Sequence, residues 1–148
     1  MSNAVETHTY TLNGVCPCKE EQSVIDRAVE LFAQSADVAS FVREMDRQRV
    51  KGKRIWYEPA RNTVFIQKQP AHVSGGGCPE NDTPIGRDCH CDHYNHLTEH
   101  LPREACQCGA EYYRPLFEAV FGSAIELYPH ETVLAGDPAC IIAVKLPD

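Results

Sequence analysis

The sequence predicts an α+β fold: an N-terminal hairpin of two helices, an antiparallel sheet, and one long C-terminal amphipathic helix. Two observations support this prediction. Segments with apolar residues at helical spacing occur together with short β-branched and aromatic runs, in the order ααββ–loop–αββ. The length of 148 residues suits one domain, so we expect residues 1–148 to form a single domain, with 1–15 as an arm and 70–86 as a glycine-rich loop.

Two helices are expected near the N-terminus. From Glu20 to Gln34, apolar residues recur at the spacing of a helix that buries one face. A second segment with this spacing runs from about Ala36 to Arg49, and Ser35 or Asp37 is suited to cap its first turn. Because the two segments are close in sequence, we expect them to pack as a hairpin.

The strands are predicted from runs of β-branched and aromatic residues. Arg54 to Glu58 and Thr63 to Lys68 are two such runs joined by Pro59 to Asn62, which indicates a β-hairpin. Nearer the C-terminus, Ala124 to Tyr128 alternates in the manner of a half-buried strand. Ala139 to Leu146 is almost continuously apolar, which is typical of a central strand.

The predicted C-terminal helix has one apolar face. Its residues follow the spacing i, i+3, i+4, i+7 and i+8, and they are Tyr113, Leu116, Phe117, Val120 and Phe121. Pro115 has no N–H to donate within a helix, so the helix should begin shortly before it, near Tyr112. Gly122 should end the helix.

The composition restricts the classes of partner. The chain has 14 basic and 21 acidic residues, a formal charge of −7. A nucleic-acid or anionic-membrane surface needs a cationic patch, so neither partner is expected. The basic cluster Lys51 to Arg54 is short, and we expect it to be solvated. No apolar run is long enough to cross a membrane, and Met1 to Tyr10 lacks the apolar core of a signal peptide, so we expect a cytoplasmic location.

Cysteine and histidine concentrate between Cys78 and Cys108, which holds five of the eight cysteines and four of the seven histidines. Thiolates and imidazoles are ligands for zinc, copper(I) or iron–sulfur centres, whereas calcium and magnesium prefer oxygen. In the cytoplasm, paired cysteines more often bind metal or do redox chemistry than form disulfides. We therefore interpret the segment as a metal site, with zinc ahead of iron or an iron–sulfur cluster. Metal-free reactive thiols and plain structural cysteines are the alternatives.

Two local conformations of this segment predict different ligands. If it is helical, one face presents Cys89, His93, His96 and His100, and Cys91 points away from them. A turn would instead bring both cysteines of that segment together, and a second pair downstream would complete a four-thiolate site. The ligands of this second geometry are Cys89, Cys91, Cys106 and Cys108, with His93 and His96 as alternates.

A catalytic site would use the same residues. The catalytic candidates are then Cys106, Cys108 and His93. A helix N-terminus lowers the pKa of a thiol placed just before it, and this favours the nucleophilic thiolate of either cysteine. A metal with three protein ligands would instead keep a position for a hydrolytic water. Tyr112 and Arg114 open the predicted helix and are the candidates for contacting a small-molecule ligand.

Residues 87–147 also contain motifs shared with known proteins, namely Cys106-x-Cys108-Gly109, Tyr112-Tyr113-Arg114, Leu116-Phe117-Glu118, Gly122 and Leu134-x-Gly136-Asp137-x-x-Cys140. This pattern resembles two groups of small bacterial proteins, the L-2-amino-thiazoline-4-carboxylate hydrolase-like family and the four-vinyl-reductase-type ligand-binding domain. The resemblance implies an α+β small-molecule-binding fold. For the hydrolase-like group it also implies ring-opening of a cyclic sulfur–nitrogen acid, with cysteines near the site. The dense histidines at positions 90–100 depart from the pattern.

The expected function is therefore metal and small-molecule binding by an intracellular domain. The alternative is a hydrolase that acts on a small cyclic C–N or C–S substrate, through metal-bound water or a cysteine thiolate. The sequence contains no His-Glu-x-x-His helix motif and no complete set of nucleophile, base and orienting residue, which favours binding. A homodimer is left open.

Overall fold

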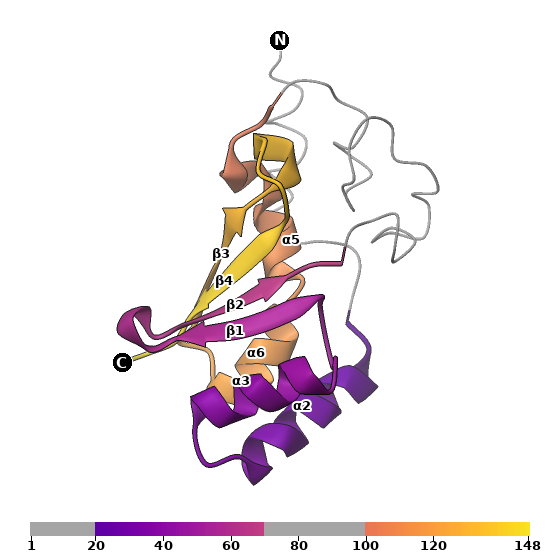
Figure 1. Ribbon diagram of the computed structural model, residues 1–148, viewed down its shortest axis with the longest axis vertical. Coiled ribbons are helices and arrows are strands. Elements are labelled where there is room, and N and C mark those ends of the chain that lie inside the picture. The colour runs from indigo at the N-terminus through magenta and orange to yellow at the C-terminus, as the bar shows by residue number, and fades with distance from the viewer. Residues whose placement is uncertain (1–19, 70–99) are drawn as a thin grey trace.

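The structure is a computed structural model that describes residues 20–69 and 100–148. The predicted arm at 1–15 and the predicted glycine-rich loop at 70–86 lie outside these residues. The described elements are two N-terminal helices, a four-stranded antiparallel sheet, two shorter helices in the C-terminal half, and short 3₁₀ turns (Figure 1). The α+β class predicted from the sequence is confirmed.

The N-terminal helices α2 (Gln22–Gln34) and α3 (Val38–Arg47) pack against each other as predicted. Each buries one apolar face; the buried residues are Ile25, Ala28 and Leu31 on α2 and Phe41, Val42 and Met45 on α3. Asp37 caps α3, because its Oδ1 accepts a hydrogen bond of 2.8 Å from the N–H of Ser40. Of the two caps considered from the sequence, Asp37 is the one that forms.

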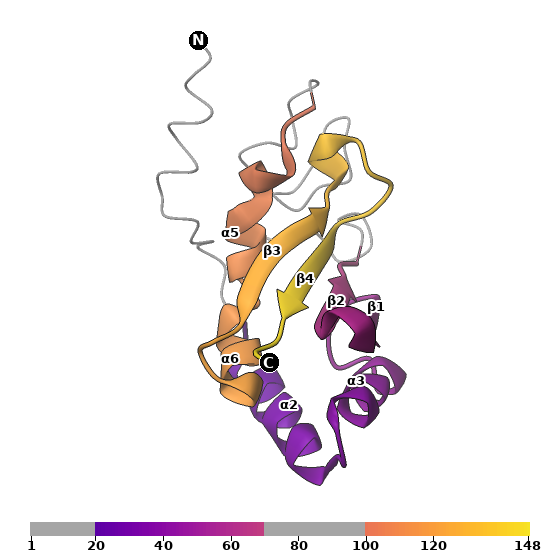
Figure 2. The same ribbon diagram turned by 90° about the vertical axis from the view of Figure 1, so that its left-hand side faces the viewer.

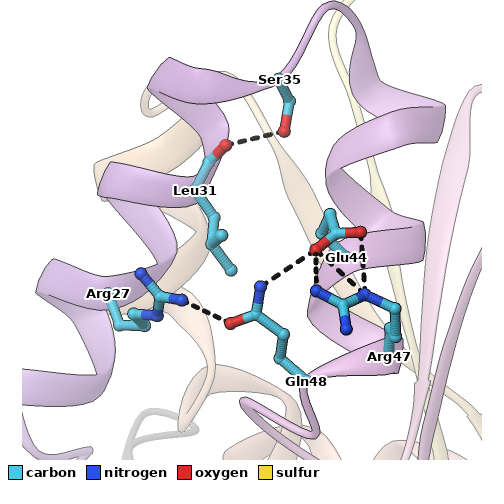
Figure 3. A network of polar contacts seen from close by, with 6 residues as sticks. All are labelled: Arg27, Leu31, Ser35, Glu44, Arg47 and Gln48. Atoms are coloured by element: carbon cyan, nitrogen blue, oxygen red, sulfur yellow. Dashed lines mark hydrogen bonds and ion pairs between the residues drawn. The ribbon is translucent and has the colours of Figure 1, made fainter.

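A polar network joins the solvent side of these two helices (Figure 3). Arg27 of α2 donates a hydrogen bond to Oε1 of Gln48, the residue that ends α3. Gln48 Nε2 in turn donates to Glu44 Oε1 at 2.9 Å, and Arg47 pairs with the same carboxylate at 2.8 Å. The two helices are therefore linked by polar contacts outside their apolar seam.

The sheet has the strand order β1-β2-β4-β3, and all neighbouring strands are antiparallel. Its strands are β1 (Arg54–Glu58), β2 (Thr63–Gln67), β3 (Glu126–Glu131) and β4 (Ile141–Lys145). The 3₁₀ helix η2 (Pro59–Arg61) closes the predicted hairpin between β1 and β2, and Asn62 follows it at φ 49°. β4 lies between β2 and β3, so the prediction of a central strand is confirmed. β3 begins at Glu126 rather than at the predicted Ala124.

The two faces of the sheet have different surroundings. One face packs on the helices, and its buried residues are Ile55, Val64, Ile66, Leu127, Ile142 and Val144. Figure 2 shows α5 and α6 along this side of the sheet, and α3 packs against β1. The other face has a smaller apolar cluster of Phe65, Ile141 and Ala143, on which Trp56 packs. The main core therefore lies between the sheet and the helices.

The prediction of one long C-terminal helix is wrong. The structure has two short helices instead, α5 (Gln107–Glu111) and α6 (Arg114–Phe121). The sequence predicts a start near Tyr112, whereas α6 begins at Arg114 with Pro115 in its first turn, where the missing N–H has no helical partner to lose, so the helix has only 8 residues. Leu116 and Phe117 are buried and Gly122 ends α6 at φ 92°, as the sequence predicted.

Candidate functional site

The described residues include only part of the predicted cysteine and histidine site. Cys106 and Cys108 lie within them, as do Tyr112 and Arg114. The other predicted ligands, namely Cys89, Cys91, His93 and His96, lie outside the described residues. The geometry of the site is therefore built from the C-terminal cysteine pair and its neighbours.

The two cysteines lie where the 3₁₀ helix η3 (Arg103–Cys106) passes into α5. Cys106 is the residue that precedes α5, and Cys108 is in its first turn; both side chains are half-buried. Ala105 and Ala110 on either side of the pair are buried, at 1% and 0% exposure. Between the cysteines, Gln107 Nε2 donates a hydrogen bond of 2.9 Å to the carbonyl of Leu127 on β3. The pair is thus attached to the sheet by buried alanines and by a polar contact.

The segment that leads into η3 is not helical at its last residues. His100 and Leu101 have no helical hydrogen bonding, so a helix that follows the predicted stripe does not extend to His100. Leu101 N–H instead donates to the carbonyl of Leu134 at 2.8 Å. The imidazole of His100 lies against Gly136, where an added Cβ would be only 2.9 Å from its Cε1. Residue 136 must therefore be small for His100 to keep this position.

A second contact between the same segments is an ion pair. The guanidinium of Arg103 donates two hydrogen bonds to the carboxylate of Asp137, of 2.8 and 2.9 Å. The N–H of Thr132 donates a third, of 2.8 Å, to the same carboxylate. The bonds from Arg103, followed by the one from Thr132, hold the pKa of Asp137 below its usual value. η3 is therefore fixed to the β3–β4 connection, which includes the 3₁₀ helix η4 (Val133–Ala135).

A buried polar cluster lies beside the α5–α6 junction, and the sequence did not reveal it. Lys51 Nζ is 2.7 Å from Glu20 Oε2 and 3.1 Å from the hydroxyl of Tyr112. The side chains of Glu20 and Lys51 are only 4% and 22% exposed. The contact between them is an ion pair without the alignment of a hydrogen bond. The expectation that Lys51 is solvated is therefore wrong, because its side chain is largely buried and paired with Glu20. This partner is distant in the sequence, so the local pattern does not reveal it.

The cluster alters the ionisation of its members. Burial opposes the charge of Lys51, but its contacts with Glu20 and Tyr112 prevail and raise its pKa. Burial raises the pKa of Tyr112. Tyr112, the predicted ligand-contacting residue, thus holds a neutral hydroxyl against an ammonium, and the ring of Tyr112 also faces that ammonium at 5.0 Å.

Arg114, the other predicted ligand-contacting residue, is engaged on its own helical surface. Its Nη2 donates to Glu111 Oε2 at 2.9 Å and its Nη1 donates to Glu118 Oε2 at 3.1 Å. The bond from Arg114 is the main cause that lowers the pKa of Glu111. The charge of Arg114 is therefore already balanced by two carboxylates, which weakens its attraction for an anionic ligand.

A second lysine lies beside α5. Lys68, which follows β2, has its Nζ 5.8 Å from the ring centroid of Tyr113. An added Cβ on Gly109 would be 3.0 Å from that Nζ. The sequence offered only an indirect signal for this contact, namely a glycine within the short cysteine-containing helix.

Within residues 20–69 and 100–148, no three or more His, Cys, Asp and Glu side chains are grouped so as to hold a metal ion. Cys140 is half-buried just before β4 rather than inside the strand as expected, and its Sγ accepts a hydrogen bond of 3.4 Å from the N–H of Val133.

In the same two ranges, no helix is long and apolar enough to span a bilayer.

Comparison with models of known protein families gives no match for this chain, and a search of curated proteins finds no similar sequence.

Proposed function

We propose that this protein binds a transition metal, zinc in the first instance, through thiolates that include Cys106 and Cys108, in a cytoplasmic setting where they stay reduced. The remaining ligands of the proposal are Cys89 and Cys91, with His93 and His96 as alternates, all of which lie outside the described residues. A small-molecule ligand beside the metal, contacted by Tyr112 and Arg114, is part of the same proposal. Zinc is preferred because four thiolates form a closed tetrahedral site for it.

One observation supports this proposal above the others. Cys106 and Cys108 are held half-buried at a junction that four contacts fix to β3 and to the connection between β3 and β4. These are the Leu101 amide bond to Leu134, the Arg103–Asp137 pair, the Gln107 bond to Leu127, and the packing of buried Ala105 and Ala110. Ligands whose backbone is fixed in advance bind a metal more tightly, since ordering them on binding would reduce the affinity.

The test is elemental analysis of protein purified under reducing conditions without a metal-affinity tag, alongside titration of accessible thiols. We expect about one zinc per chain, with several thiols protected from the reagent. Cys106→Ser combined with Cys108→Ser should abolish the zinc, whereas the matched control Cys140→Ser should retain it. Wild-type protein without metal, or unchanged zinc in the double variant, would contradict the proposal.

A hydrolase is the second candidate, because the half-buried position of Cys106 and Cys108 leaves part of each side chain accessible to a substrate. It would open a small cyclic C–N or C–S substrate through metal-bound water or a cysteine thiolate. His93→Ala separates the two candidates. Loss of turnover with retained metal would support the hydrolase, whereas loss of both metal and folding would support a closed structural ion.

A further inference from the structure

The face of the sheet that points away from α5 and α6 carries aromatic rings from three strands (Figure 2). The strand register places Trp56, Phe65, Ala143 and Tyr128 in one row across the four strands. Trp56 stacks on Phe65 with ring centroids 5.5 Å apart, and the ring of His130 lies 4.9 Å from that of Phe65. Phe65 is buried beneath its neighbours, whereas Tyr128 is 38% exposed. We call this surface the aromatic face.

The aromatic face has the residue types that dominate the binding energy of protein interfaces, namely Trp, Tyr and Arg. The guanidinium of Arg54 lies 4.4 Å from the ring centroid of Trp56, and that of Arg61 lies 5.2 Å from that of Phe65. These contacts hold two long side chains against the sheet. Side chains that are already ordered lose less conformational entropy when a partner binds.

The β1 side of the aromatic face carries one positive charge that is not balanced. Arg61, in the turn between β1 and β2, pairs with Glu58 at 2.6 Å. Arg54 is exposed, and within residues 20–69 and 100–148 it has no carboxylate at ion-pair distance. The guanidinium of Arg54 can therefore accept a carboxylate from a partner.

The β3 side carries the opposite charge. Glu126 lies directly across from Lys145 on β4, whereas Glu131 lies across from the apolar Ile141. In the part of the chain that the structure describes, Glu131 forms no ion pair. It feels the charge of Arg103, but the hydrogen bonds of that guanidinium go to another carboxylate. Glu131 is therefore the unbalanced anion of the aromatic face.

The register places these two opposite charges at the two ends of one row. Arg54 pairs with Gln67, Gln67 with Ile141, and Ile141 with Glu131. A two-fold axis parallel to the strands would lay β1 of one copy over β3 of a second copy and keep each row at the same height. Arg54 would then meet Glu131 of the second copy, and Trp56 would meet Tyr128 of the second copy, each contact occurring twice.

We propose that the aromatic face is the contact surface of a homodimer, in which two sheets pack face to face with β1 of each copy over β3 of the other. Sheets that pack in this way keep their strands within about 30° of each other, which retains the matched rows. The charge complementarity of the face with itself is the observation that selects a second copy as the partner. The proposal is independent of the metal site.

The size of the sheet predicts how tightly the copies associate. Four strands of about five residues cover roughly 19 Å by 17 Å, or about 300 Å² in plan, at ordinary strand spacings. A standard interface buries about 800 Å² on each partner. We therefore expect a weak dimer whose population depends on protein concentration.

The first experiment is sedimentation of the full chain under reducing conditions, from about 10 μM to about 1 mM, a range that covers weak association. The fraction of dimer should rise across this range. Arg54→Glu and Glu131→Arg should each raise the dissociation constant about tenfold or more, because like charges then face each other. Arg43→Glu, the same change at an exposed arginine of α3, is the matched control and should leave the dissociation constant unchanged. A wild-type chain that stays monomeric would overturn the proposal, whether or not the face binds a different partner.

Mixing the two charge variants gives the sharpest test. In a mixed dimer the reversed charge at position 54 meets the reversed charge at position 131, and the second contact keeps its native pair. An equimolar mixture should therefore associate about as tightly as wild type, although each variant alone does not. Failure of the mixture to regain association, with both variants folded by circular dichroism, would overturn the proposed arrangement.

The fluorescence of Trp56 reports on the aromatic face directly, because it is the only tryptophan of the chain. Its emission should shift to shorter wavelength over the concentration range in which the dimer forms, since association removes water from the ring. A dimer that forms without a change in this emission would use another surface and would overturn the proposal.

A further variant keeps the test decisive if a charge variant does not fold. Tyr128→Glu changes an exposed side chain and places a carboxylate opposite Trp56 of the second copy. Burying this charge without a partner should raise the dissociation constant about tenfold or more. A wild-type dissociation constant in Tyr128→Glu would overturn the proposal.

Discussion

At one end of the molecule α2, α3 and α6 meet through apolar side chains, whereas at the opposite end η3 and η4 are joined by an ion pair as well as containing buried Ala105 and Leu134 (Figures 1 and 2). We call the first the helical end and the second the thiol end, which consists of η3, the start of α5, and η4. At the helical end, Phe32, Phe41 and Phe121 form a cluster of edge-to-face rings with centroids 5.2 to 5.8 Å apart. Such packing stabilises the fold as a whole.

At the thiol end the contacts are fewer and directional. Leu101 bonds to Leu134, Arg103 pairs with Asp137, and the ring of His100 lies on Gly136. Contacts of this kind near the surface add little to global stability but fix the position of the chain. From this difference we expect mutations at the helical end to change the stability of the protein. Mutations at the thiol end should instead change the local geometry around Cys106 and Cys108.

The largest expected effect is at the helical end. Phe117 is fully buried, at 0% exposure, and stacks on Phe121 with ring centroids 6.2 Å apart. Phe117→Ala should lower the free energy of unfolding by about 3–5 kcal/mol, because it removes apolar contacts and leaves a cavity. Chemical denaturation measures this. Val29→Ala on α2 is the control, since Val29 is 39% exposed and its loss should cost less than about 0.5 kcal/mol. Similar losses for both variants would contradict the assignment of the core to this end.

The elements of the helical end were largely predictable from the sequence, because their signals are local. The apolar spacing of α2 and α3 and the cap at Asp37 lie within the helices themselves. The apolar run of β4 likewise predicted its central place in the sheet. The length of the C-terminal helix was mispredicted, since the apolar spacing begins at Tyr113 while α6 itself begins only at Arg114. The separate helix α5 has no apolar periodicity to reveal it.

The surroundings of the candidate site were much less predictable, because its contacts join residues far apart in the sequence. Lys51 is beside other basic residues along the chain, which predicted a solvated cluster, but its partner is Glu20. Lys68 reaches Gly109 from the end of a strand, and residue types alone do not indicate that approach. The cysteine motif predicts a site in this part of the chain, and that prediction is local, whereas the contacts around Cys106 and Cys108 depend on how the sheet meets α5.

An intermediate effect is expected at Gly136, and it distinguishes stability from geometry. Gly136 and Gly122 have φ of 99° and 92°, so alanine at either position should cost about 1–3 kcal/mol in backbone strain. An added Cβ meets the ring of His100 only at Gly136, whereas at Gly122 it meets nothing within 4 Å. Hydrogen exchange at the amide of Leu101 measures the local difference. Gly136→Ala should accelerate this exchange more than its stability loss explains, and Gly122→Ala should not. Equal acceleration would show that the His100 contact does not position the thiol end.

The smallest effect should come from Asp137 and should appear as a pH dependence. The pKa of Asp137 is lowered in the folded protein from its ordinary value of 3.8, by Arg103 first and then by Thr132. A lowered folded-state pKa stabilises the protein above the unfolded value, and this stability is lost as the pH falls through the folded pKa. Asp137→Asn should therefore be less stable than wild type near neutral pH, by less than the glycine variants lose, and the gap should close below about pH 4.

Comparing the free energy of unfolding of wild type with that of Asp137→Asn at each pH separates the effect of Asp137 from that of other acidic groups. Glu44, whose pKa the hydrogen bond from Arg47 lowers to about 2, and Asp37, whose pKa is lowered by its cap with Ser40, contribute the same slope to both proteins. They cancel when the stability of Asp137→Asn is subtracted from that of wild type at each pH. Because Arg103 is half-exposed, added salt should also reduce the remaining difference. A difference that stays constant with pH would mean that the carboxylate of Asp137 acts only through shape and neutral hydrogen bonds, and that the polar description of the thiol end is wrong at this position.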